Sequence, residues 1–142
     1  MANSQTAFLD RSQVPTRQAL QEAVKSLQFK LTIDESYVPF ECAGYIPCTL
    51  DGEDAGFEIK FGDSSALLGD ASDLRAQIGD RDTAITFRWG GDPRERVSAM
   101  IISTVLAQSF GALVRRQDED AFRTTDQLLN EARAAFTQLQ EQ

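Results

Sequence analysis

The sequence predicts an α+β domain in which a mainly antiparallel sheet of about five strands is covered by two or three helices. Short stretches of alternating apolar and polar residues, typical of half-buried strands, are interspersed with segments of helical periodicity. An Asp-Gly turn signal at residues 51–52 separates two neighbouring strand segments, which is typical of a hairpin. The 142 residues suit a single domain, 1–142, large enough to bury a core.

The first element that we expect is a helix over residues 16–27, because Pro15 stands just before it and one helical face is apolar. That face consists of Ala19, Leu20, Ala23, Val24 and Leu27. We expect residues 1–14, which precede this helix, to be a flexible N-terminal segment.

Three strands are predicted next, at residues 29–34, 45–50 and 57–62. The stretch "DGEDAG", residues 51–56, is expected to join the second strand to the third. Since Pro47 cannot donate a backbone hydrogen bond, we expect its strand to lie at an edge of the sheet or to contain a bulge.

Residues 63–83 are the least regular part of the sequence, with a short helical turn expected from Asp73 to Ile78. A functional loop and a solvated connector both remain open for this stretch. A clear strand follows at 83–89, and then a helix at 93–110 that is apolar almost all round and therefore expected to be central.

Gly111 suits the end of that helix, and a further strand is expected at 112–117 with a turn at 118–120. The last helix begins with a capping-box spacing of Thr124 and Gln127. The predicted order is α-β-β-β-loop-β-α-β-α.

The stretch "RWGGDPRER", residues 88–96, poses the question of a phosphate site at a helix N-terminus. It lacks the lysine of a Walker loop and the glycine spacing of a dinucleotide fingerprint. Asp92 is expected to cap the helix, with Pro93 as its first residue and Glu95 two residues later, so that carboxylates occupy the place of a phosphate. We expect its arginines, Arg88, Arg94 and Arg96, to neutralise nearby acidic residues.

Residue types that carry catalysis or bind cofactors are poorly represented. The chain has no histidine, none of its lysines follows the serine–lysine spacing of a hydrolase, and the stretch that begins "DGEDAG" lacks the ligand spacing of a calcium loop. We therefore expect no enzyme, no catalytic residues, no cofactor and no metal site. Cys42 and Cys48 match no zinc spacing, so we expect two reduced thiols, with a disulfide left open.

Acidic residues concentrate in one third of the chain. Residues 34–82 contain twelve acids against three basic residues, a net charge of −9 within a total of −8. Such a surface repels nucleic acid and suits a basic protein partner. No secretory signal or membrane-spanning segment is recognisable, so we expect a cytoplasmic protein without membrane contact.

The candidate partner-binding residues are acids of this segment together with two tyrosines. They are Asp51, Glu53, Asp54, Glu58, Asp63, Asp70, Asp73, Tyr37 and Tyr45. The tyrosines, like Phe40 nearby, are expected to be interface anchors if exposed. Packing of these aromatic rings into the sheet end is the alternative.

The succession of "GYIPCTLDGEDAGFE", "ITFRWGGDPRE", an apolar helix, "GALVRRQDEDAF" and "TTDQLLNEA" resembles small acidic immunity proteins encoded beside bacterial polymorphic or type VI-secreted toxins. The resemblance spans residues 15–135 and rests on general pattern. It implies interbacterial competition, in which the protein binds a cognate toxin and blocks a basic active site that handles nucleotides or nucleic acids.

Two other classes remain open. An acidic secretion chaperone for an effector protein has a similar composition and would hold an unfolded segment. An enzyme with a carboxylate-only site is the third class, and a homo-oligomer is compatible with any of them.

Overall fold

The computed structural model describes residues 3–69, 72–117, 119 and 121–141. Its centre is a six-stranded sheet in the spatial order β2-β3-β4-β5-β1-β6, with every neighbouring pair antiparallel. The strands are β1 (Ser4–Leu9), β2 (Leu31–Ile33), β3 (Gly44–Leu50), β4 (Glu53–Asp63), β5 (Thr83–Arg88) and β6 (Leu113–Arg116). The predicted α+β class is confirmed, with six strands instead of about five.

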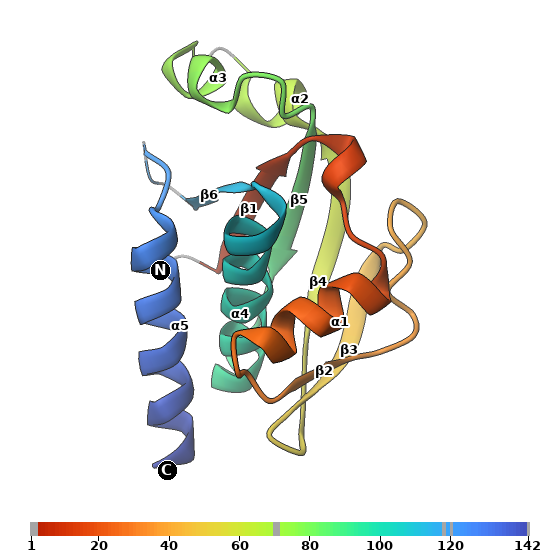
Figure 1. Ribbon diagram of the computed structural model, residues 1–142, viewed down its shortest axis with the longest axis vertical. Helices are drawn as coiled ribbons and strands as arrows, with labels where there is room; N and C mark the ends of the chain where they lie inside the picture. The colour runs from red at the N-terminus through yellow and green to blue at the C-terminus, as the bar shows by residue number, and fades with distance from the viewer. Residues whose placement is uncertain (1–2, 70–71, 118, 120, 142) are drawn as a thin grey trace.

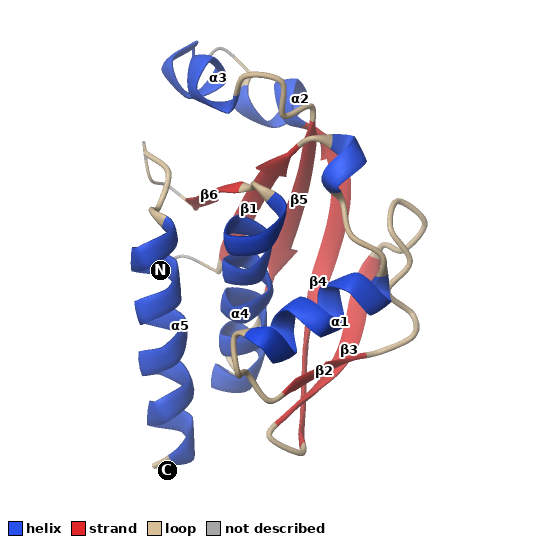
Figure 2. Ribbon diagram, in the orientation of Figure 1, coloured by secondary structure: helices blue, strands red, loops and turns tan. Residues whose placement is uncertain are grey.

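The helices are arranged in two groups, as Figures 1 and 2 show. The larger group lies over one face of the sheet and comprises α1 (Arg17–Ser26), α4 (Pro93–Phe110) and α5 (Thr125–Gln140). The smaller group, α2 (Ser64–Leu68) and α3 (Ser72–Ile78), lies at one end of the sheet. A short 3-10 turn at Arg11–Gln13 links β1 to α1.

Strand β1 corrects our expectation of a flexible N-terminal segment. It lies inside the sheet, paired with β5 on one side and β6 on the other. Ala7, Phe8 and Leu9 are at most 1% exposed, because this strand is covered on both faces at its C-terminal end. The pairing partners lie far along the chain, so no local pattern in the sequence signals it.

The hairpin between β3 and β4 is tighter than we expected. Asp51 and Gly52 have φ values of 52° and 83°, which is the two-residue geometry whose twist matches that of the flanking strands. As a result β4 begins at Glu53, and part of the expected loop 51–56 belongs to the strand.

Pro47 lies in β3, which is the second strand of the sheet rather than an edge strand. The short edge strand β2 ends at Ile33, opposite Cys48, so Pro47 faces the position just beyond its end. The backbone N–H of Asp34 donates to the Pro47 carbonyl there (3.3 Å). In a β-strand the backbone N and O of one residue point toward the same neighbouring strand. The nitrogen of Pro47, which carries no hydrogen, therefore points past the end of β2, where no paired strand needs a donor.

The central helix α4 is buried from Val97 to Ala107, as its all-round apolar sequence predicts. Two hydroxyls inside it bond back to its own carbonyls: Ser103 to Ala99 (2.9 Å) and Thr104 to Met100 (2.7 Å). Thr104 also reaches the Leu128 carbonyl of α5 (3.2 Å), which joins the two helices. The predicted caps of α5 by Thr124 and Gln127 are both formed.

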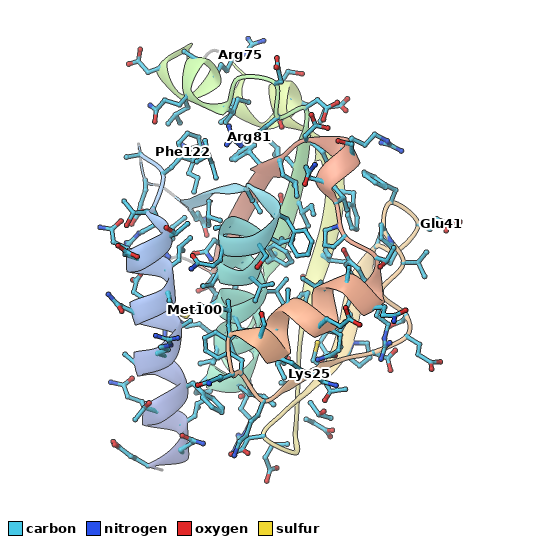
Figure 3. All side chains as sticks on the ribbon, in the orientation of Figure 1. Lys25, Glu41, Arg75, Arg81, Met100 and Phe122 are labelled. Carbon is cyan, nitrogen blue, oxygen red and sulfur yellow. The ribbon has the colours of Figure 1, made fainter. Side chains whose placement is uncertain are left out.

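The two faces of the sheet differ. The main core fills the space between the sheet and α1, α4 and α5, whereas α2 and α3 bury a second cluster on the opposite face. This cluster consists of Phe8, Leu68, Leu74, Ile78 and Ala84, with Leu113 and Phe122 (labelled in Figure 3) packed against it. The rest of the second face is lined mainly by partly or fully exposed polar side chains; we call it the open face.

In the described part of the chain, no helix is long and apolar enough to cross a membrane. Both cysteines are free: Cys42 is half-buried and Cys48 is buried. Burial raises the pKa of the Cys48 thiol to about 12, which keeps it protonated.

The position of β1 predicts unequal effects for the same truncation at two leucines. Leu9 of β1 is 0% exposed and Leu67 of α2 is 50% exposed. Leu9→Ala should lower the free energy of unfolding by about 2–5 kcal/mol because it leaves a cavity, whereas Leu67→Ala should change it by less than about 0.5 kcal/mol. Urea denaturation measures both, and equal effects would contradict the buried position of β1.

Candidate functional site

The turn between β5 and α4 is built by local hydrogen bonds, and the predicted helix start is confirmed there. Asp92 is the N-cap, and its Oδ1 accepts from the backbone N–H of Arg94 (2.9 Å). Pro93 is the first helical residue. The carboxylate of Glu95 turns back to accept from the backbone N–H of Gly90 (3.1 Å), which fixes this carboxylate beside the end of the sheet.

Tyr45 lies on the open face of β3 and is 51% exposed. Its ring rests on Gly56 of the neighbouring strand, where a Cβ would come within 2.6 Å of Tyr45 Cζ. Its hydroxyl donates to the Ala55 carbonyl (3.1 Å). The ring is therefore held in one place although half of it faces solvent.

The register of the strands brings charged residues beside this ring. Tyr45 pairs with Glu58 of β4, which in turn pairs with Arg88 of β5, so the three form a row across the open face. Asp54 lies on the same face of β4, on the other side of Gly56. We call Tyr45, Asp54, Glu58, Arg88 and Glu95 together the Tyr45 surface.

A hollow of about 360 Å³ lies at the centre of this surface. It is lined by Asn3, Tyr45, Glu58, Arg88, Trp89, Gly90 and Glu95. Partial desolvation raises the pKa of the Tyr45 phenol, and the negative charges of Glu95, Asp54 and Asp92 are among the further causes. The carboxylates of Glu95 and Asp54 therefore lie close enough to the ring to disfavour a second negative charge there.

The structure divides the other predicted acids between the two ends of β4. Asp51 and Glu53 lie at the hairpin tip, where Asp51 pairs with Lys30 (3.9 Å) and accepts from Gln140 of α5 (3.4 Å). Asp63 and Asp73 lie at the α2–α3 end and are exposed. At about 3.3 Å per residue, the length of β4 separates the two groups by roughly 30 Å. Asp70 lies outside the described residues.

Tyr37 is not a surface anchor, which corrects our prediction for it. It is 3% exposed, and its hydroxyl donates to the Pro15 carbonyl (3.1 Å). Phe40 is half-buried, with the Arg11 guanidinium carbon 3.8 Å from its ring centroid. Both rings also pack near Phe61. For Tyr37 the alternative that we left open is therefore correct: its ring packs into the end of the sheet.

We expected Arg88, Arg94 and Arg96 to neutralise nearby acidic residues. None of the three forms an ion pair with a described carboxylate. Arg88 is nevertheless the cross-strand neighbour of Glu58. The described ion pairs of the second half of the chain lie elsewhere, and they join Arg116, Glu119, Arg123 and Glu131.

Sequence reasoning missed Arg88 and Glu95 as members of this surface, together with the lining residues Asn3 and Trp89. Their proximity to Tyr45 depends on the pairing of β3, β4, β5 and β1, which brings together residues as far apart in the sequence as Ser4 and Arg88. The sequence did contain one signal. Apolar and polar residues alternate within each strand, and this alternation places Tyr45, Glu58 and Arg88 on the polar face.

Neither a family model, nor a curated protein, nor a solved structure matches the chain. Among the residues that the structure describes, no group of three or more His, Cys, Asp or Glu is placed to hold a metal ion. Function has to be inferred from the surface of the molecule itself.

The contact between Tyr45 and Gly56 predicts a sensitive position. In Gly56→Ala the new methyl group would also meet the Ile46 carbonyl at 2.7 Å, so the ring must move and the strand must adjust. We expect a loss of about 1–3 kcal/mol in the free energy of unfolding and a fall of the Tyr45 pKa toward its ordinary value as the ring becomes more exposed. Denaturation and spectrophotometric titration of the phenols measure the two effects.

Gly62→Ala is the matched control, because Gly62 lies in the same strand with open space around its Cα. It should change the free energy of unfolding by less than about 0.5 kcal/mol and leave the Tyr45 titration unchanged. A Gly56→Ala variant that behaves like Gly62→Ala would mean that Gly56 does not position the ring.

Proposed function

We propose that the protein is an immunity-type inhibitor that binds a folded, basic toxin domain in the cytoplasm and occludes its active site with the Tyr45 surface. The resemblance of the sequence to acidic immunity proteins supports this class of partner. The geometry around Tyr45 supports this surface as the place of contact.

The observation that carries this proposal is the half-exposed but fixed ring of Tyr45. A side chain held in its bound position loses little conformational entropy when a partner packs on it. Tyrosine is also enriched among the residues that dominate the energy of protein interfaces. Strand β3, which contains Tyr45, is paired with β4, and the two strands form a rigid support for such an anchor.

The charges around the ring favour a basic partner. Asp54, Glu58 and Glu95 place carboxylates around an aromatic face, an arrangement that suits an arginine or lysine side chain. Enzymes that bind phosphate groups expose such side chains in their active sites. The net charge of −8 would also accelerate the encounter with a basic protein at low salt.

The distribution of apolar side chains favours this partner over an unfolded effector segment. A chaperone would bind an extended chain over exposed apolar patches. The large hydrophobic residues that are exposed in the described part of the chain are Val38, Tyr45 and Leu67. They lie in a loop, in β3 and in α2, so each belongs to a different element.

A growth-protection experiment with the protein encoded by a neighbouring gene, which the proposal requires to contain a toxin domain, tests the proposal. Tyr45→Ala should lose protection and weaken binding by about 2 kcal/mol or more, since the anchor is removed. Tyr45→Phe keeps the ring and should retain most of the binding. Calorimetry with the purified toxin domain measures the affinities. Full protection by Tyr45→Ala would remove Tyr45 from the interface, and no binding of the toxin domain would refute the proposed function.

Charge reversal distinguishes the two groups of acids. Replacing Asp54 and Glu58 together by lysine should lower the association rate and its dependence on salt. The same reversal at Asp63 and Asp73, with an equal change in total charge, should have a smaller effect because these residues lie at the other end of β4. Equal effects of the two double variants would show that only total charge matters, against a specific Tyr45 surface.

A further inference from the structure

A second, larger cleft opens on the helix side of the β5–α4 turn. Its volume is about 610 Å³, within the range typical of small-molecule sites. It is lined by Asn3, Trp89, Gly90, Gly91, Asp92, Pro93, Arg96, Met100 and Arg116. Met100, labelled in Figure 3, comes from α4, whereas Arg116 comes from the edge strand β6.

Two arginines, Arg96 and Arg116, line this cleft, and Arg116 is paired with Glu131. The side chain of Arg116 is only 15% exposed and is held by two bonds: Nε donates to Gln5 Oε1 (3.1 Å) and Nη1 to Glu131 Oε2 (3.1 Å). Its Nη2 has no hydrogen-bond acceptor among the described residues, and neither has the exposed guanidinium of Arg96. Asp92, the carboxylate in the lining, is already bonded to the start of α4.

Buried polar atoms without partners lie directly behind Arg116. Gln5 is 1% exposed, and its Nε2 has no hydrogen-bond partner; the same holds for Oε1 of Glu131. Gln5 is the cross-strand neighbour of Arg116, in the row next to Asn3 and Trp89. A buried amide with an unused donor is costly in a core, and such groups concentrate at functional sites.

The remaining wall is apolar. Trp89 is 9% and Met100 3% exposed, and Pro93 completes this side. The cleft thus combines an apolar wall with two guanidinium groups, one of them held in a fixed position. Guanidinium groups recognise carboxylates by paired, charge-assisted hydrogen bonds.

We propose that this cleft binds a small organic carboxylate, with the carboxylate on Arg96 and Arg116 and the apolar body against Trp89, Pro93 and Met100. Such a ligand would bind the free protein, so this site does not depend on the toxin partner of the proposed function.

Three probes that share a phenyl ring test the proposal: benzoate, its neutral isostere benzamide, and the cation benzylamine. Titration of the ¹⁵N-labelled protein should give saturable shifts of the Gly90 and Gly91 amides and of the Trp89 indole with benzoate. Benzamide should bind at least about tenfold more weakly, because it lacks the charge-assisted bonds. Benzylamine should give no saturable shift. An absence of saturable shifts with benzoate, or equal affinity for benzamide, would overturn the proposal.

Acetate tests the apolar half of the site, and a pair of arginine variants tests the half that would bind the carboxylate. Acetate should bind at least about tenfold more weakly than benzoate, since it lacks the apolar body. Arg96→Gln should weaken benzoate binding by about tenfold, whereas Arg94→Gln, the same change on the same helical turn but outside the cleft, should leave it unchanged. Equal binding of acetate and benzoate, or equal effects of the two variants, would reduce the site to nonspecific attraction of anions.

Discussion

The structure depends on the burial of α4 on all sides. Every residue from Val97 to Ala107 is buried, which requires the sheet beneath the helix and α1 and α5 along its two flanks (Figure 1). Because α4 begins directly after β5, its free backbone amides have to be satisfied within a short turn. Asp92 caps them, and Glu95 bonds back to Gly90. The packing of the core thereby fixes a carboxylate beside Tyr45, on the opposite face of the sheet.

The same turn borders both hollows of the molecule. Asn3, Trp89 and Gly90 line the hollow at Tyr45 and also the cleft at Arg116. The charged residues that line the hollow on the open face are Glu58, Arg88 and Glu95, and those that line the cleft on the helix side are Asp92, Arg96 and Arg116. From the sequence we interpreted this turn only as the start of a helix. In the structure it also separates two surfaces whose charged residues differ.

The helices were predictable because their signals are local. The cap of α4 by Asp92, the capping box of α5 and the apolar character of α4 can each be read within a few residues. Strand β1 was missed because its stability comes from pairing with β5 and β6, and because Gln5, a polar residue, is buried within it. The number of acidic residues in 34–82 can be read from the sequence, but the distances between them depend on the fold. The length of β4 separates Asp51 and Glu53 from Asp63 and Asp73, and the register alone brings Glu58 and Arg88 beside Tyr45.

The proposed function requires a toxin partner to dock on the Tyr45 surface. Amide hydrogen exchange of the protein, alone and bound to the proposed toxin partner, tests this most directly. We expect slower exchange in the complex at residues 44–47 of β3 and at the 88–91 turn, with little change in α2 and α3. Protection confined to α2 and α3, or to the exposed sides of α1 and α5, would contradict the account.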